Sequence, residues 1–237
     1  MDVLLYGQEA EKLRPLIEKS AGLRLVSKTP ETVVCFGGDG TLLAAERLWP
    51  GVPKVPLRNS RRGIRCISGP PDGVIAQLAA GRLVPHPQLK LACDVEFADS
   101  SRPAQHTVAL NEISGHMGRV TSSLRFRVWF DGRPYGTARD HEFIGDGFVV
   151  SSPFGSTAYF NQITHGVFLQ GIGVAFKYTN EQTTHVIVTE GTVVRVQITR
   201  GPAMLAHDSA PDIIDADTGD TLTIRRAEEQ AVLLMPE

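Results

Sequence analysis

Residues 33 to 48, VVCFGGDGTLLAAERL, constrain the fold more than any other stretch of this chain. A short apolar run stops at two glycines, a single carboxylate follows at Asp39, and a helical pattern of leucine and alanine begins at Thr41. A buried strand that turns tightly into a helix is typical of an open α/β sheet. Ligands of such sheets bind at the carboxyl ends of the strands, so Asp39 stands where a ligand is expected.

This glycine turn is suited to phosphate. Gly37, Gly38 and Gly40 allow backbone angles and close approach that side chains would block, and Thr41 opens a helix whose free N–H groups attract anions. Asp39 is suited to removing a proton from an attacking hydroxyl or to holding a hydrated Mg²⁺. The alternative is that Gly-Gly-Asp-Gly is only a tight strand-to-helix turn.

The two parts of the chain have different patterns. The first part alternates strands, predicted over 2–7, 32–38 and 54–59, with helices, predicted over 9–22, 41–49 and 71–81. The second part predicts short strands over 90–99, 106–114, 123–136, 148–152, 184–190, 192–200 and 220–227, with a hairpin signal at Asp131-Gly132. Two prolines within 81–90 interrupt both helix and strand. We therefore expect an α/β domain with a parallel sheet over 1–88 and a mostly antiparallel β domain over 89–237.

Composition narrows the class of partner. The formal net charge of -2 gives no overall attraction to nucleic acid or to an anionic membrane. The N-terminus lacks a signal-peptide pattern, and no window is apolar enough to span a bilayer. Cys35, Cys66 and Cys93 are widely separated, which predicts reduced core thiols in a cytoplasmic protein. The expected partner is a small molecule.

A second motif lies in residues 107–114, TVALNEIS, which we interpret as a strand. In it Asn111 and Glu112 replace apolar residues. An adjacent amide and carboxylate can bind the paired hydroxyls of a ribose or the edge of a base. The alternative is an edge strand with a polar outward face.

The third motif, GDGFVVSSPFGSTAYF over 145–160, is the most specific. A turn at Asp146 leads into a strand, and the chain then bends before Ser156 and Thr157 start a helix. These hydroxyls either cap that helix or face a nucleotide. Tyr159 adds an aromatic face with a polar tip.

Together, GGDGT, LNE and GDGFVVSSPFGSTAY resemble the NAD kinase family in their order and separations. The resemblance extends over about residues 31 to 235. It implies an α/β N-terminal domain, a C-terminal β-sandwich domain, an active site between them, and a homodimer or homotetramer. The implied activity moves the terminal phosphoryl group of ATP or polyphosphate, with Mg²⁺, to the 2′-hydroxyl of the adenosine ribose of NAD.

The resemblance also implies a role for each motif residue. Asp39 would be the catalytic carboxylate that activates the ribose hydroxyl, and the glycines around it would admit the donor phosphates. Asn111 and Glu112 would hold the dinucleotide. The stretch 203–224 resembles the late strand pair of the family, which carries an aspartate next to the site, here Asp208. The residues expected to line the nicotinamide and adenine pockets are Asp146, Thr157, Ala158 and Tyr159, and Ser156 is a further candidate for substrate binding.

Two segments depart from the family pattern. The glycine-rich loop, approximately N-x-G-x-L-G-F in the family, here reads LRNSRRGIRCIS and gains the arginines Arg58, Arg61, Arg62 and Arg65. Guanidinium groups bind phosphate bidentately, so Arg61 and Arg62 are candidates to bind the donor; the alternative is a solvated loop. Residues 160–167 lack the small-residue run of the family.

These departures leave the acceptor open. Another nucleotide or nucleoside is the alternative substrate, and a catalytically weak NAD(P)-binding module is the alternative function. Asp39 in an intact Gly-Gly-Asp-Gly turn argues against the binding module, which would not need that base. The seven histidines form no ligand pattern, so we expect no structural metal and only Mg²⁺ with the donor.

Overall fold

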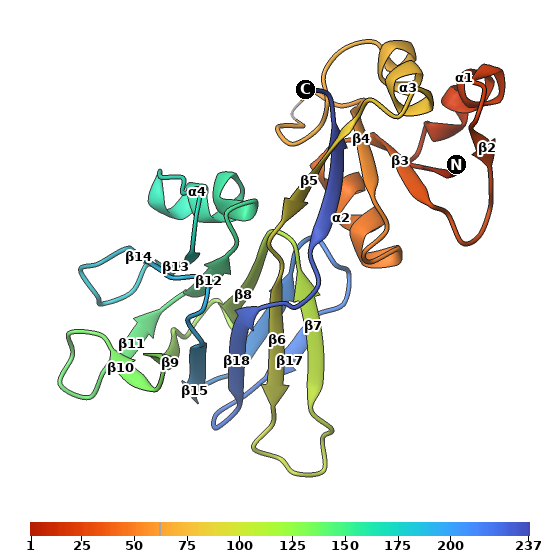
Figure 1. Ribbon diagram of the computed structural model, residues 1–237. Coiled ribbons are helices and arrows are strands. Elements are labelled where there is room, and N and C mark those ends of the chain that lie inside the picture. Colours follow the sequence, from red (N-terminus) through yellow and green to blue (C-terminus); the bar gives the residue numbers. More distant parts are fainter. Residues whose placement is uncertain (62) are drawn as a thin grey trace. The chain divides into compact units, whose positions relative to one another are not determined.

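The computed structural model describes residues 1–61 and 63–237 and separates into two compact units (Figure 1). The first unit contains residues 1–88 and 229–237, and the second contains residues 89–228. The first is an α/β unit with a largely parallel sheet, and the second has two antiparallel sheets. The predicted fold class is confirmed.

The first unit has one six-stranded sheet in the order β2-β1-β3-β4-β19-β5. Neighbouring strands are parallel except β5, which is antiparallel to β19. The strands are β1 (Asp2–Tyr6), β2 (Arg24–Leu25), β3 (Thr32–Gly37), β4 (Lys54–Arg58), β5 (Val84–Gln88) and β19 (Ala231–Met235). The helices are η1 (Ala10–Leu13, a 3-10 turn), α1 (Arg14–Lys19), α2 (Asp39–Leu48) and α3 (Pro71–Ala79).

Both faces of this sheet are covered. Val55 of β4 packs in one core cluster with Ile17 of α1 and Ile75 of α3. Lys54 points to the opposite face, because successive strand residues alternate, and its buried ammonium forms an ion pair with Glu46 of α2. Helices on both faces explain why β3 and β4 are almost entirely apolar and buried.

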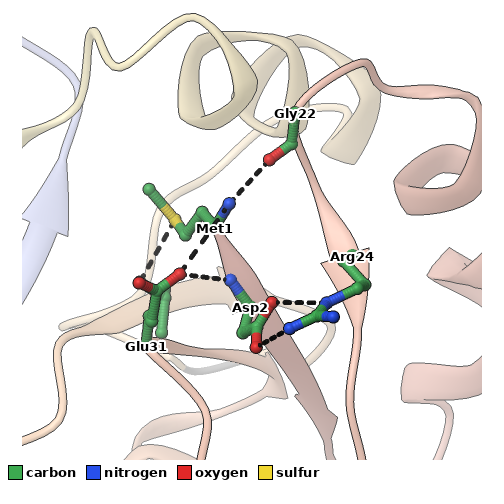
Figure 2. Close-up of polar contacts among 6 residues, drawn as sticks. Met1, Asp2, Gly22, Arg24 and Glu31 are labelled. Carbon is green, nitrogen blue, oxygen red and sulfur yellow. Dashed lines mark hydrogen bonds and ion pairs between the residues drawn. The ribbon is translucent and has the colours of Figure 1, made fainter.

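The short edge strand β2 is tied to β1 by polar contacts (Figure 2). Asp2 and Arg24 are register partners, and the Arg24 Nε donates to Asp2 Oδ1 over 2.8 Å. The amino group of Met1 donates to the Gly22 carbonyl over 2.8 Å, and the Asp2 amide donates to Glu31 over 2.5 Å. The Arg24 side chain is 75% exposed, so this pair orders the sheet edge more than it stabilises the fold.

The second unit is a β-sandwich. One sheet has the order β10-β9-β15-β18-β6-β7 with β11 also paired to β9, and the other has the order β14-β13-β12-β8-β16-β17. The first sheet contains β6 (Leu91–Glu96), β7 (Gln105–Ala109), β9 (Leu124–Phe130), β10 (Arg133–Tyr135), β11 (Glu142–Gly145), β15 (Val194–Arg200) and β18 (Thr221–Arg226). The second contains β8 (Glu112–Met117), β12 (Gly147–Ser151), β13 (Ile172–Lys177), β14 (His185–Val188), β16 (Ala203–His207) and β17 (Ile214–Ala216).

The inner faces of these two sheets share one core, which includes Phe126 of β9 and Phe148 of β12. The connection after β12 forms η2 (Gly155–Thr157) and α4 (Tyr159–Thr164). Phe160 of α4 packs on Val149 and Ala175, so α4 covers the outer face of β12 and β13. The Asp131-Gly132 hairpin is confirmed between β9 and β10, with positive φ at both residues.

The two prolines within 81–90 do not interrupt a strand, contrary to the prediction. Pro85 and Pro87 lie inside β5, which is the edge strand of its sheet. They occupy alternate positions opposite β19, where the missing N–H groups can face away from the ladder. The C-terminal part of the predicted 89–237 domain also needs correction, because β19 pairs with β4 and β5 and carries residues 229–237 into the first unit.

Two further findings concern the cysteines and membrane-spanning helices. The three cysteines are free and buried, as expected for core thiols. No helix in the described part of the chain is long and apolar enough to cross a bilayer.

Candidate functional site

Asp39 is the first residue of α2, two residues earlier than the predicted helix start, with Gly38 as N-cap. Its carboxylate accepts two backbone N–H groups from the loop that follows β4. The Ile64 amide donates to Oδ2 over 3.0 Å and the Arg65 amide donates to Oδ1 over 2.9 Å. A carboxylate offers about four lone-pair sites, so these two amides leave one site on each oxygen, and the Cys66 thiol faces the one on Oδ1. The side chain is therefore fixed in direction and still able to accept a proton.

The thiol of Cys66 completes the surroundings of Asp39. Its Sγ lies 3.5 Å from Asp39 Oδ1. Burial and then the Asp39 carboxylate raise the pKa of the Cys66 thiol to about 12. Cys66 therefore stays protonated at neutral pH and acts as a weak donor to Asp39, not as a nucleophile.

The three glycines of the turn have different reasons to be glycine. None has a positive φ, so the expected need for special backbone angles is wrong. A Cβ on Gly37 would lie 2.2 Å from Thr41 Oγ1, and one on Gly38 would lie 2.9 Å from Ser60 Oγ. A Cβ on Gly40 would meet nothing within 4 Å. Packing requires the first two glycines, whereas Gly40 leaves open space beside Asp39.

The arginine-rich loop is bonded to the end of β3 and contains a turn of its own. The Asn59 amide donates to Gly37 over 2.7 Å, and Ser60 Oγ accepts the Gly63 amide over 3.1 Å. Arg61 is exposed, which fits both the phosphate interpretation and the solvated one. Arg62, the other candidate, lies outside the described residues.

In the second unit, Asn111 and Glu112 do not lie within one strand. The predicted strand 107–114 breaks after Ala109, so that β7 joins one sheet and β8 joins the other. Both side chains are buried, so the alternative of an edge strand with a polar outward face is also wrong. The polar pair marks the connection where the chain crosses between the two sheets.

Asp208 organises this connection. Its carboxylate accepts the amides of Leu110 over 2.9 Å, Asn111 over 2.7 Å and Glu112 over 3.3 Å. In return, the Asp208 amide donates to the Glu112 carbonyl over 3.0 Å. Asp208 has φ +47°, in the left-handed region. The loose sequence match at Asp208 thus coincides with a residue that fixes the backbone of the LNE motif.

The residue that follows β12, Ser152, also binds the connection between β7 and β8. The Ser152 amide donates to the Asn111 carbonyl over 2.9 Å, and the Ser152 hydroxyl donates to the Leu110 carbonyl. A Cβ on Gly155 would lie 2.2 Å from the Asn111 oxygen, so glycine is required there. The LNE motif is therefore in direct contact with the end of β12 and with Gly155, the first residue of GSTAY.

Glu112 is an unusual acid. The residue is only 8% exposed, and Oε2 has no hydrogen-bond partner among the described residues. Burial, and secondarily the negative charge of Asp208, raises the pKa of Glu112 to about 8. The group is therefore mostly protonated at neutral pH and can donate a hydrogen bond as well as accept one.

Ser156 and Thr157 do not cap α4. Both lie in η2, Ala158 is the N-cap, and its position has no side-chain cap hydrogen bond. Ser156 is buried and its hydroxyl lies 2.8 Å from the Pro153 carbonyl and 3.0 Å from the Phe168 carbonyl. The capping interpretation is wrong, and the geometry gives Ser156 a structural role.

Tyr159 and Asp146 lie at the other end of β12. The Tyr159 ring stacks on His116 with ring centres 5.9 Å apart, and Lys177 Nζ lies 5.3 Å from the ring centre. The Asp146 amide donates to the Lys177 carbonyl over 2.9 Å. His116 and Lys177 were not anticipated from the sequence, because they lie on different strands, β8 and β13, and are 61 residues apart.

The predicted residues thus form three groups. The Asp39 turn belongs to the first unit. In the second unit, one group contains Asn111, Glu112 and Asp208, and another contains Asp146 and Tyr159. The described residues include no cluster of three or more histidine, cysteine or acidic side chains placed to hold a metal ion.

The curated relatives described here are all named NAD kinase. No family model matches the chain. A protein named NAD kinase from Gemmatimonas aurantiaca is 32% identical over 144 residues, which are 58% of this chain and 47% of that relative. One from Lacticaseibacillus paracasei is 34% identical over 163 residues, 63% of this chain and 55% of the relative. One from Chromobacterium violaceum is 28% identical over 233 residues, 94% of this chain and 76% of the relative. The chain spans about half the length of the first curated relatives that it matches.

Solved structures agree with these names. Yeast NADH kinase, determined with NADH, matches with a TM-score of 0.86 at 15% identity and covers all of this chain and 84% of its own. An NAD kinase from Archaeoglobus fulgidus, determined with ATP, matches with a TM-score of 0.79 at 18% identity, over all of this chain and 94% of its own. The chain therefore has the fold of the NAD kinase family and is related to that family in sequence.

Proposed function

We propose that this chain is a phosphotransferase that moves the terminal phosphoryl group of ATP or polyphosphate to the 2′-hydroxyl of the adenosine ribose of NAD, giving NADP. The observation that carries the proposal is the Asp39 carboxylate, fixed at the start of α2 by two backbone amides and flanked by the open space at Gly40. Phosphoryl transfer is mostly positioning and charge neutralisation, so one oriented base suffices for the protein's part.

In this proposal Asp39 takes the proton from the ribose hydroxyl as its oxygen attacks the terminal phosphorus. ADP, or a polyphosphate shortened by one unit, leaves with the electrons of the broken P–O bond. Arg61 and the N–H groups at the start of α2 would neutralise donor phosphates. Mg²⁺ would enter with the donor, held by those phosphates and by water, since Mg²⁺ usually keeps several waters and binds substrate phosphates.

The second unit would hold the acceptor. Asn111 and Glu112 offer an amide and a neutral acid for ribose hydroxyls, in a backbone held by Asp208. Thr157, Ala158, Tyr159 and Asp146 are the remaining proposed contacts. Ser156 is proposed only as a support for this segment, because its hydroxyl is engaged with backbone carbonyls.

The related proteins support the nucleotide classes. The archaeal NAD kinase was determined with ATP and the yeast NADH kinase with NADH. For this chain we propose ATP as the first donor to test and polyphosphate as the second. The free buried thiols support a cytoplasmic location, and the family resemblance supports a homodimer or homotetramer.

A second candidate keeps the chemistry but changes the acceptor to another nucleotide. It is favoured by the altered segments 58–65 and 160–167, and by the unanticipated Lys177 beside Tyr159. A binding module without turnover is less well supported, because it would not need the oriented carboxylate at Asp39.

The deciding experiment measures NADP formation from NAD with Mg²⁺ and either ATP or polyphosphate, beside the Asp39→Asn variant. Activity that is lost in the variant supports the kinase and identifies the donor. A thermal-shift panel of NAD, NADH, NADP and adenosine runs in parallel, because a ligand of the folded state raises its stability. If another nucleotide stabilises the chain and NAD does not, that nucleotide replaces NAD as the proposed acceptor.

A further inference from the structure

A pocket of about 410 Å³ lies in the second unit, beside the Tyr159 ring. Its walls come from α4, the end of β13 and the connection that follows β13. Its lining includes Tyr159, Gln162, Lys177, Tyr178 and Glu181. Gln162 and Tyr178 are exposed, so the pocket is open to solvent. An aromatic wall with polar groups suits a planar ligand.

Lys177 is held in place within this pocket. Its Nζ lies 2.9 Å from His116 Nδ1 and 5.3 Å from the centre of the Tyr159 ring. An ammonium group can only donate, so Nδ1 must be the unprotonated nitrogen and accept. The remaining N–H at Nε2 then donates to Ser114 Oγ over 2.9 Å. Burial and the charge of Lys177 lower the pKa of His116, which agrees with a neutral ring.

The positive charge of Lys177 is not neutralised within the pocket. Among the described residues no carboxylate lies within ion-pair distance of its ammonium. The one acidic lining residue, Glu181, is engaged elsewhere, because its carboxylate accepts the Thr137 amide over 2.6 Å and the Gln182 amide over 2.9 Å. Lys177 donates one hydrogen bond to His116 and keeps two N–H groups for a ligand.

We propose that this pocket takes a ligand group that carries an oxyanion, a carboxylate or a phosphate, and that Lys177 selects it. The inference rests on the proposed function and names its substrate class: a nucleotide acceptor with an acidic group on the part that lies against Tyr159. Nicotinic acid adenine dinucleotide fits this description, whereas NAD carries a neutral carboxamide at the same ring position. The lysine, oriented in advance by His116, makes the difference between these two ligands.

The test compares that pair of ligands, which differ only in carboxylate against carboxamide. Calorimetric titration of the full chain, without a phosphoryl donor, gives the ratio of the two dissociation constants. We expect tighter binding of the carboxylate ligand by about tenfold, the effect of one charge-assisted hydrogen bond in a partly exposed site. Lys177→Met should bring this ratio close to one, and Lys177→Arg should keep part of it. Lys19→Met, on the exposed end of α1, is the matched control.

Inorganic phosphate separates the two sources of the oxyanion. A Lys177-dependent rise in melting temperature with phosphate alone supports a phosphate group, and a Lys177-dependent preference for the carboxylate dinucleotide supports a carboxylate. Neither response, or a ligand ratio unchanged in Lys177→Met, overturns the proposal. If the chain turns over NAD but does not prefer the carboxylate ligand, this inference is wrong and the proposed kinase activity stands. If binding depends on Lys177 but no acceptor is phosphorylated, the proposed kinase activity is wrong and this inference stands.

Discussion

The Asp39 carboxylate has two roles in the proposed reaction. Its oxygens accept hydrogen bonds from the loop, and they take the proton of the ribose hydroxyl. Asp39→Asn keeps the shape but replaces one oxygen by an NH₂ group, which cannot accept the Ile64 or Arg65 amide. We expect turnover to fall by roughly 10²–10⁴-fold, the usual contribution of a general base. Nucleotide affinity should stay within a few fold. Steady-state kinetics and calorimetric titration measure the two effects separately.

The control for this variant is Asp72→Asn. Asp72 also stands in the first turn of its helix, α3, but it is exposed and lies outside the glycine turn. A loss of turnover in both variants would point to a general effect of first-turn acids on helix stability. Full turnover in Asp39→Asn would remove Asp39 from the role of base.

Glu112 makes stability depend on pH in an unusual direction. Its folded-state pKa of about 8 lies above the ordinary value of 4.5, so the folded state binds the proton more tightly than the unfolded state. Between these two pH values the folded chain carries more protons, and its free energy of unfolding falls as the pH rises. Glu112→Gln removes this dependence because the amide does not titrate.

Chemical denaturation of both proteins at pH 5, 6, 7 and 8 checks the prediction. We expect Glu112→Gln to gain stability relative to the wild type across this range, by an amount on the order of a few kcal/mol at its upper end. A difference that is constant with pH would mean that Glu112 titrates normally in the fold. Glu228→Gln, the same change at an exposed position, controls for the effect of net charge.

At the scale of elements, the turn from β3 to α2 offers two contrasting glycine substitutions, one at Gly40 in α2 and one at Gly37 at the end of β3. Gly40→Ala adds a methyl group in open space and should stabilise the helix by ~1 kcal/mol through helix propensity. If the space beside Asp39 receives substrate, the same variant loses turnover while its melting temperature rises. Gly37→Ala should instead lower the melting temperature, because its Cβ would lie 2.2 Å from Thr41 Oγ1.

Differential scanning calorimetry and turnover, measured on both variants, separate packing from ligand space. Gly191→Ala, whose Cβ would also meet nothing within 4 Å, is the control distant in sequence. If Gly40→Ala is more stable and its turnover is unchanged, Gly40 serves only the strand-to-helix turn and not substrate binding.

The same elements show what the sequence could and could not predict. The β3–turn–α2 unit was predicted because a buried strand, glycines and helical spacing are all local signals. The break between β7 and β8 was not, because only pairing with β12 and the hydrogen bonds to Asp208 distinguish a sheet crossing from a polar edge strand. The edge position of β5 was equally hidden, since its partner β19 lies far along the chain.

The candidate site shows the same limit. The motif residues themselves were predicted, but not the groups that orient them: the Ile64 and Arg65 amides at Asp39, and His116 behind Lys177. Backbone donors leave no trace in side-chain patterns. His116 and Lys177 come from strands 61 residues apart, so no local spacing links them.

At the scale of the whole molecule, residues 229–237 belong to the first unit, and this determines which fragments can fold. β19 lies between β4 and β5 in the sheet, so a fragment of residues 1–88 would leave β5 without its neighbour and expose part of the core. Residues 89–228 contain both sheets of the sandwich and their shared core. We propose these bounds as the folding units.

The corresponding prediction compares three fragments. Residues 89–228 should unfold cooperatively by calorimetry, because every strand of the sandwich keeps its partners. Residues 1–88 alone should show little cooperative unfolding and bind hydrophobic dye, whereas 1–88 joined to 229–237 by a flexible linker should recover a transition. Such a linker costs little more than a few RT in closure entropy, so pairing of β19 outweighs it. A cooperative transition in 1–88 alone, equal to that of the joined fragment, would show that β19 is not needed and that the unit ends at residue 88.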